Sequence, residues 1–263
     1  MKYIVDHDYH IHSQLSVCSR HPEQTPERIL QYAKDCGLSK IVLTDHYWDS
    51  AVPGASKWYE PQNFDHIAQF RNLPQAEGIE FLFGCESDMD KHGVIGVPPE
   101  RFDDFAFIII PTTHLHMKGF TIREDDYCVD ERVAQLWVER LDRLLDMDLP
   151  FHKMGIAHFT CETLAYYSTG TLSDVINSIS DSDFFEFFER AAKCGIGIEL
   201  NVHLEHASMP EIMRPYKIAR QCGCKFYLGS DAHKGLELDG APARFAAVVD
   251  ALDLTEDDKY RIP

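Results

Sequence analysis

The sequence predicts an α/β fold in which seven parallel strands, each followed by a helix, close into one barrel. The chain has 263 residues, an ordinary length for a single α/β barrel. Short apolar runs alternate along it with amphipathic segments, and most of these runs are nearly continuous in apolar residues, as the strands of a buried parallel sheet are. We therefore expect one domain spanning residues 1–263.

Each predicted strand is a short apolar run with polar residues at its end. The seven runs cover residues 3–12, 40–46, 80–87, 105–113, 154–158, 196–201 and 225–231. Amphipathic helices are predicted at residues 25–37, 129–147, 173–194 and 210–222. The first of these is bounded by Thr25 as its N-cap, by Pro26 in its first turn and by Gly37 at its end. In such barrels the functional residues lie at the carboxyl ends of the strands.

Net charge limits the classes of partner. The formal net charge is −18, from 43 acidic and 25 basic residues, and such a field repels the phosphates of DNA and RNA. We therefore expect no nucleic-acid partner. A small anionic substrate stays compatible, because bound metal ions reverse the charge of a pocket locally.

The N-terminus and the cysteines indicate the compartment. The chain turns polar within its first six residues, unlike a signal peptide, and it has no apolar run of membrane-spanning length. We expect a soluble cytoplasmic protein with no membrane partner and leave its oligomeric state open. The eight cysteines are spread through a chain without a secretion signal, so most are expected to be reduced thiols.

Six of the seven predicted strands end in a histidine or a carboxylate. His10 and His12 end the first strand, and residues two apart on a strand point the same way, so both rings can face one centre. The other five ends carry Asp45 with His46, Glu86, His114, His158, and Asp231 with His233. Imidazole with carboxylate favours zinc, with manganese or iron as alternatives. More than four ligands in one barrel mouth indicate more than one ion, and Glu86 is the natural bridge.

The ordered motifs resemble the polymerase and histidinol phosphatase (PHP) superfamily. D-x-H-x-H at residues 8–12, T-D-H at 44–46, the glutamate after the third strand, later single histidines and G-S-D-A-H at 229–233 follow the family's order over nearly the whole chain. The resemblance implies a distorted seven-stranded β/α barrel.

The resemblance also implies three metal positions. The first would use His10, His12, Glu86 and Asp231. The second would share Glu86 and add His114 and His158. The third would use His46, His233 and one ligand from the loop after H-x-H. Ungapped alignment places Cys18 at this last position, and His21 would serve if the loop were one turn longer. A centre with two ions instead of three is the alternative.

This centre predicts hydrolysis by activated water. Clustered divalent ions lower the pKa of a bridging water, and the chain has no G-x-S-x-G, Walker or Rossmann motif that would indicate another mechanism. Together with the resemblance, this predicts a metal-dependent phosphatase for a small phosphate monoester, with L-histidinol phosphate, an intermediate of histidine biosynthesis, as the best candidate. Glu86 would bridge the ions, and Asp231, His233 or a water would protonate the leaving group. Asp45 would either accept a hydrogen bond from a ligating imidazole or cap a loop.

Residues that bind the substrate are less clearly marked. Histidinol phosphatases of the family commonly carry an arginine in the loop after the sixth strand, whereas residues 199–208 contain none. Candidate contacts to the substrate are His21, Arg20, Lys118, His203 and Lys234. The aromatic residues of segment 47–62 would line a pocket for a ring, or form a lid or a dimer contact. Alternative activities are hydrolysis of nucleotides or cyclic phosphates, amidohydrolase-like C–N or lactone hydrolysis, and metal binding without catalysis.

Overall fold

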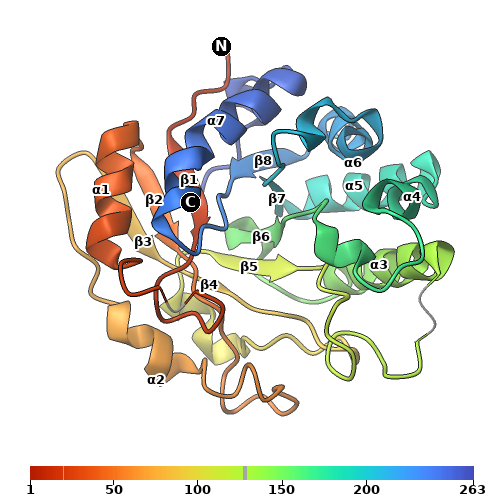
Figure 1. Cartoon of the computed structure of the whole chain (residues 1–263), viewed down its shortest axis with the longest axis horizontal. Helices are drawn as coiled ribbons and strands as arrows, with labels where there is room; N and C mark the ends of the chain where they lie inside the picture. The colour runs from red at the N-terminus through yellow and green to blue at the C-terminus, as the bar shows by residue number, and fades with distance from the viewer. Residues whose placement is uncertain (20, 127–128) are drawn as a thin grey trace.

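The computed structural model describes residues 1–19, 21–126 and 129–263, and parallel strands form its centre (Figure 1). The strands are β1 (His7–Ile11), β2 (Lys40–Leu43), β3 (Glu80–Phe83), β4 (Cys85–Glu86), β5 (Ile108–Pro111), β6 (Met154–Ala157), β7 (Gly197–Leu200) and β8 (Lys225–Leu228). The helices are α1 (Pro26–Cys36), α2 (Phe64–Ile67), α3 (Asp130–Leu145), α4 (Leu172–Asn177), α5 (Asp181–Cys194), α6 (Pro210–Gln221) and α7 (Gly235–Ala251). Short 3-10 turns cover Ala68–Phe70, Pro99–Asp104, Phe151–Lys153, Glu162–Ala165, His206–Ser208 and Glu256–Asp258.

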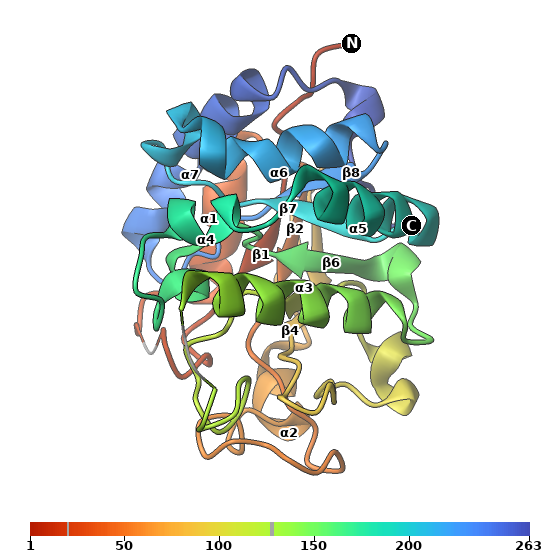
Figure 2. The ribbon, with the colours of Figure 1, turned by 90° about the vertical axis from the view of Figure 1, so that its right-hand side faces the viewer.

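The strands form two parallel sheets that together make the predicted barrel. One sheet has the order β1-β2-β3 and the other the order β4-β5-β6-β7-β8. Helices α1, α7, α6, α5, α4 and α3 lie around the strands in Figure 1, and Figure 2 shows α2 below them. The predicted fold class is confirmed. The strand count differs from seven, because the third predicted strand is divided into β3 and β4.

Gly84 divides that strand and joins the two sheets. Its N–H donates to Leu43 O of β2 at 2.8 Å, whereas the next residue, Cys85, donates to Phe107 O beside β5 at 3.1 Å. A Cβ atom on Gly84 would lie 2.5 Å from Phe107 O and 2.8 Å from a methyl group of Val42. The backbone can therefore pass from one sheet to the other only where residue 84 has no side chain. Glu86 follows two residues later.

The barrel closes between β8 and β1 with few ladder hydrogen bonds. Beyond the end of β8, Asp231 N donates to His10 O at 2.8 Å and His12 N donates to Ala232 O at 3.1 Å. Lower on the same seam, the N–H of Leu228 donates to the ring Nε2 of His7 at 3.0 Å. The other ring nitrogen of His7 bonds to Asp6 at 2.8 Å, which leaves Nε2 as the acceptor. A neutral imidazole thus replaces a backbone carbonyl in the seam.

Alternate residues of the strands fill the barrel interior. The interior cluster consists of Tyr9, Val42, Phe107, Ile109, Ala157, Tyr227, Tyr260 and Ile262. The last two come from the C-terminal segment, in which Tyr260 N donates to Phe226 O at 2.8 Å and Tyr260 Oη donates to His152 O at 2.5 Å. These contacts lie near the amino ends of β8 and β6, so the C-terminal segment closes that end of the barrel. The larger apolar cluster lies between the strands and the surrounding helices.

The helices follow the sequence expectation with three differences, one of which is the short helix α2, which was not predicted. The predicted helix at 173–194 is two helices, α4 and α5, because Ser180 and Asp183 form a capping box that starts a new helix. Helix α7 was not predicted, since its amphipathic pattern is weak and Pro242 lies inside it. The first helix begins after Thr25 and ends at Gly37, which has φ 67°, as predicted.

Two further expectations concern the cysteines and the membrane. The seven described cysteines are all free, and Cys128 lies outside the described residues. Among the described helices, none has the length and apolar character needed to cross a bilayer.

Acidification is expected to weaken the fold through His7. Burial lowers the pKa of the His7 imidazole in the folded chain, so the unfolded chain binds more protons once the pH falls below the ordinary histidine value. The contribution of neutral His7 to the free energy of unfolding is therefore fully present above the ordinary histidine pKa and declines as the pH falls below it. His7→Gln retains an acceptor that does not titrate. Between about pH 7.5 and pH 5.5, the melting temperature of the metal-free wild type should fall more steeply than that of the variant. Parallel declines would contradict the assignment.

Candidate metal centre

The polar ends of the strands meet at the carboxyl end of the barrel. Three groups of donor atoms lie there, and the atoms of each group are within 4.8 Å of one another. The groups are His10, His12, Glu86 and Asp231; Glu86, His114 and His158; and His12, His46 and His233. The structure therefore brings together nearly all of the predicted ligands.

In the first group, two imidazoles and two carboxylates surround one point. The Nε2 atoms of His10 and His12 lie 3.3 and 3.1 Å from Glu86 Oε2, and the same two distances separate them from Asp231 Oδ1. The two ring nitrogens are 3.1 Å apart. Such a four-donor set of imidazole and carboxylate suits a divalent ion.

Glu86 belongs to two groups and uses a different oxygen in each. Oε2 faces His10 and His12, whereas Oε1 lies 3.2 Å from His158 Nε2 in the second group. A carboxylate divided in this way is arranged to bridge two cations. The predicted placement of Glu86 between two positions matches this geometry.

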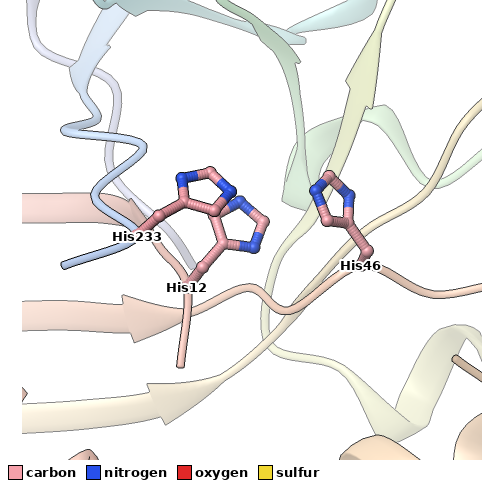
Figure 3. Close-up of side chains that lie close together, drawn as sticks. All are labelled: His12, His46 and His233. Atoms are coloured by element: carbon pink, nitrogen blue, oxygen red, sulfur yellow. The ribbon is translucent and has the colours of Figure 1, made fainter. Parts of the chain in front are cut away.

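The third group differs from the predicted third position in that it includes His12. The rings of His12 and His233 are stacked with centroids 4.2 Å apart, and His46 lies across from them with its centroid 4.4 Å from that of His12 (Figure 3). His46 Nδ1 is buried 3.1 Å from Glu86 Oε2 and has no hydrogen-bond partner within the described chain. A buried nitrogen that faces a carboxylate without a hydrogen bond is suited to a cation between them.

Cys18 and His21 were the alternatives for the last ligand of this group. Cys18 Sγ lies 2.9 Å from His233 Nε2, whereas His21 is in none of the three groups. The structure therefore favours Cys18 through its contact with His233, although the thiol, like His21, lies outside the three groups of donor atoms.

The ring of His12 is oriented through Ser16. His12 Nδ1 lies 2.9 Å from Ser16 Oγ, and this hydroxyl donates to Asp45 Oδ1 at 2.7 Å. Because the hydroxyl proton points to Asp45, Ser16 accepts from His12 Nδ1 and the lone pair of Nε2 faces the centre. The prediction that Asp45 accepts directly from a ligating imidazole is wrong. Asp45 also accepts from Ser13, so it caps the loop after β1.

Glu199 orients two candidate metal ligands, a role that was not predicted for it. Its Oε1 lies 2.6 Å from His10 Nδ1, and its Oε2 accepts from the backbone N–H of His158. Glu199 is fully buried in β7 between Ile198 and Leu200. A lone carboxylate inside an apolar strand was the signal that could have identified it.

Asp88 performs the same task for His114 and was also missed. Asp88 Oδ2 lies 2.8 Å from His114 Nδ1 and accepts from Tyr59 Oη at 3.0 Å. The Nη2 atom of buried Arg140 lies 3.6 Å from the other oxygen of Asp88. These contacts leave His114 Nε2 free to face the centre.

The backbone is strained at two of the candidate ligands. His158 and Asp231 have φ angles of 26° and 53°, a region that side chains other than glycine rarely occupy. Each such residue costs about 1–3 kcal/mol and persists where surrounding contacts fix it, often at functional sites. Here the hydrogen bond of His158 N to Glu199 and that of Asp231 N to His10 O fix the two turns.

Opposite charges determine how the centre titrates without metal. Burial opposes ionisation of Glu86, yet His46 and His10 hold its pKa well below the ordinary value. Burial likewise opposes protonation of His10, but Glu199, Asp231 and Glu86 raise its pKa well above the ordinary value. A metal ion therefore competes with a proton for His10, and metal affinity is expected to decrease as the pH is lowered.

The other predicted contacts to the substrate lie farther out. Lys118 is exposed, with its ammonium 4.9 Å from the ring centroid of Tyr167, and Lys234 is exposed 3.3 Å from Glu237. His203 is exposed at the rim of a cavity next to His233. Arg20 lies outside the described residues.

A cavity of about 500 Å³ opens onto the centre. Glu86, His114 and His158 line its base, and Trp58, Tyr59 and Met117 line an aromatic and apolar wall. We call it the aromatic cavity. Trp48 also belongs to the aromatic segment 47–62 but does not line this cavity, and its ring packs against Phe120 with ring centroids 5.2 Å apart.

Glu199→Gln should weaken metal binding without unfolding the chain. The amide retains an acceptor for His10 but removes the charge that makes this imidazole a strong ligand, and loss of such an outer partner costs about 10–100-fold in metal affinity. Competition with a chromogenic chelator measures the affinity, and Glu189→Gln on exposed α5 is the control. Equal affinity of the variant and the wild type would remove Glu199 from this role.

Comparisons with known proteins place these features in a family. A model of the PHP domain matches residues 8–243, whereas a comparison with curated proteins gave no match. Among solved structures, histidinol phosphate phosphatase (HisK) from Lactococcus lactis subsp. lactis Il1403, in complex with zinc, L-histidinol and phosphate, matches with a TM-score of 0.56 and 18% identity over 94% of this chain and 93% of that chain. At this identity the similarity concerns the fold.

A second solved structure, triazine hydrolase from Arthobacter aurescens, has a TM-score of 0.40 and 11% identity over 97% of this chain and 72% of that chain, too low a score to support an argument. The PHP model, in contrast, covers all the strands except the first residue of β1, and it covers each member of the three donor groups. The chain therefore belongs to the PHP domain family.

Proposed function

We propose that this protein is a metal-dependent phosphoesterase that hydrolyses a small phosphate monoester. The observation that carries the proposal is the division of Glu86 between two histidine-containing donor groups at the base of an open cavity. Such an arrangement holds two or three divalent ions side by side, and an ester oxygen can reach them from the cavity. Membership of the PHP family supports the same chemistry.

Zinc is the ion that we propose for the centre, with manganese and iron as alternatives. Imidazole nitrogens, carboxylate oxygens and the adjacent Cys18 thiol suit zinc. The solved HisK structure, which shares this fold, is in complex with zinc. His10, His12, Glu86 and Asp231 would hold one ion, Glu86, His114 and His158 another, and His12, His46 and His233 with Cys18 a third. Divalent ions supply activation of water at neutral pH and neutralisation of phosphoryl charge.

The side chains of the chain would then orient the ester and handle its proton. Burial opposes ionisation of Asp231, yet His10 and His233 hold its pKa well below the ordinary value, so its carboxylate is a better ligand than proton donor. In the alternative centre with two ions, the Nε2 of His233 carries no metal, and His233 is then the candidate side chain for protonating the leaving oxygen. It lines the aromatic cavity, and its Nδ1 is fixed 2.8 Å from Asp231 O. A water is the alternative donor.

The aromatic cavity indicates a substrate with a planar or apolar alcohol portion. The Trp58 ring is half-buried at its wall, with its centroid 4.9 Å from that of His46, and Tyr59 is fixed by its hydrogen bond to Asp88. An imidazole or a nucleobase could pack on this wall beside the metal ligands. L-histidinol phosphate is therefore the first candidate substrate, and nucleotides and cyclic phosphates are the alternatives.

An amidohydrolase-like C–N or lactone hydrolase is the second candidate function. Such enzymes commonly bridge their metals with a carboxylated lysine, and Glu86 occupies the equivalent place here. No lysine lines the described wall of the aromatic cavity. The presence of that cavity beside the donors also argues against metal binding without catalysis.

A phosphate-release screen tests the proposal. The zinc-loaded protein should release phosphate from at least one of L-histidinol phosphate, nucleoside monophosphates, 3′,5′-bisphosphates and cyclic phosphates, and removal of metal by a chelator should abolish the release. Metal content is measured on the same sample. Normal metal content without phosphate release from any substrate would sink the proposal.

Glu86→Gln should lose metal and activity together. A neutral amide cannot bridge two cations, so the loss of activity should exceed the roughly 10–100-fold that loss of an outer partner costs. Metal content and the rate of phosphate release are compared with those of Glu162→Gln, an exposed position near the same end of the barrel. Retention of the full metal content by Glu86→Gln would remove Glu86 from the centre.

A further inference from the structure

A second cavity adjoins the centre on the side of Asp231 and His233. It has a volume of about 560 Å³ and shares Cys18, Asp231 and His233 with the aromatic cavity. Glu86 lines the aromatic cavity but not this one. A phosphoryl group close to Glu86, His114 and His158 would therefore lie in the aromatic cavity, whereas the second cavity borders the centre at Asp231 and His233.

The wall of this second cavity carries Arg244, which extends from α7. Its Nη1 donates to Asn201 Oδ1 at 3.2 Å and its Nη2 donates to Ser230 O at 2.9 Å. These bonds fix the plane of the guanidinium, yet they use only part of its five N–H donors. Arg244 is half-buried and forms no ion pair with any described carboxylate. Nine other described arginines each lie within 4.0 Å of a carboxylate oxygen.

The two carboxylates that line the cavity, Asp231 and Glu237, are already engaged by other groups. Asp231 Oδ1 lies 3.3 and 3.1 Å from the Nε2 atoms of His10 and His12, within the first donor group. Glu237 Oε2 accepts from the backbone N–H of His233 at 2.7 Å, and Oε1 lies 3.3 Å from the ammonium of Lys234. No comparable anion neutralises Arg244 among the described residues. The cavity thus presents an oriented, uncompensated positive charge beside the metal centre.

We propose that this Arg244 cavity binds a second acidic group of the substrate, a carboxylate or a second phosphoryl group. A fixed guanidinium with free N–H donors recognises either group through paired, charge-assisted hydrogen bonds. The inference rests on the proposed phosphoesterase function and ranks its candidate substrates. Phosphate esters with a second acidic group are favoured over L-histidinol phosphate, whose amino group carries the same charge as Arg244.

The loop after the sixth predicted strand, residues 199–208, contains no arginine that could bind phosphate. Arg244 contacts this loop from helix α7 instead. Asn201 directly follows β7 and accepts a hydrogen bond from Arg244, although the two residues belong to different segments. His203, two residues later, lies at the rim of the same cavity. The loop and α7 therefore share one anion-binding surface.

Matched pairs of substrates test the proposal on the zinc-loaded protein. Adenosine 3′,5′-bisphosphate is compared with adenosine 5′-monophosphate, and O-phosphoserine with O-phosphoethanolamine, so that each pair differs by one acidic group. The wild type should have the higher kcat/KM for the acidic member of at least one pair. Arg244→Gln should reduce that preference by roughly 10–100-fold, the range expected when one charged hydrogen-bond partner is removed.

Two further variants separate recognition from a structural role. Arg244→Lys retains the charge and should keep part of the preference, and Arg190→Gln removes a half-buried arginine of α5 that lines neither cavity and should leave the preference unchanged. An equal loss for both members of each pair in Arg244→Gln, or no preference in the wild type, would overturn the inference. If no ester releases phosphate, the same pairs are compared as ligands by isothermal titration calorimetry. Equal affinity within each pair then overturns this inference, whereas the missing hydrolysis counts against the proposed function alone.

Discussion

The centre depends on keeping a carboxylate ionised although almost none of its surface is exposed to solvent. Glu86 is 1% exposed and lies among four imidazoles that come from the ends of three different strands. An isolated buried charge costs several kcal/mol, so the arrangement is tolerable only with cations or protons around it. Imidazoles brought by separate strands provide those positions. The barrel supplies the geometry, since it gathers the ends of all its strands into one small volume.

The hydrogen-bonded and charged partners of the imidazoles extend outward from the centre into the rest of the fold. His10 depends on Glu199, His12 on Ser16 and Asp45, and His114 on Asp88. Asp88 in turn faces Arg140, whose other N–H groups donate to the carbonyl oxygens of Met89, Thr112 and Thr121. Helix α3 is thereby connected to the strand ends by the same charge that holds His114. The orientation of a ligand and the packing of a helix are two effects of one network.

Patterns local in sequence predicted the fold class and the donors. The spacing of His10 and His12, and a polar residue at each strand end, were sufficient to expect a shared centre. Contacts between distant segments could not be read in this way. Glu199 reaches His10 across the barrel, Ser16 stands between His12 and Asp45, and Arg244 reaches Asn201 from a helix whose own pattern was too weak to predict. The division of the third strand was hidden for a related reason, because the crowding at Gly84 comes from Val42 and Phe107 on other strands.

The segment that ends in Tyr260 and Ile262 has a consequence for the kinetics of the protein. It closes the amino end of the barrel, and side chains fill the interior, so the candidate centre is reached from the carboxyl end. In a hydrolase of the proposed kind, the ester and both products then share a single mouth. The phosphate ion leaves from the same ions that the next ester must occupy. In such an enzyme, substrate would enter and products would leave through this one end of the barrel. Accumulated phosphate would then slow turnover, because it would occupy the site that the incoming ester needs.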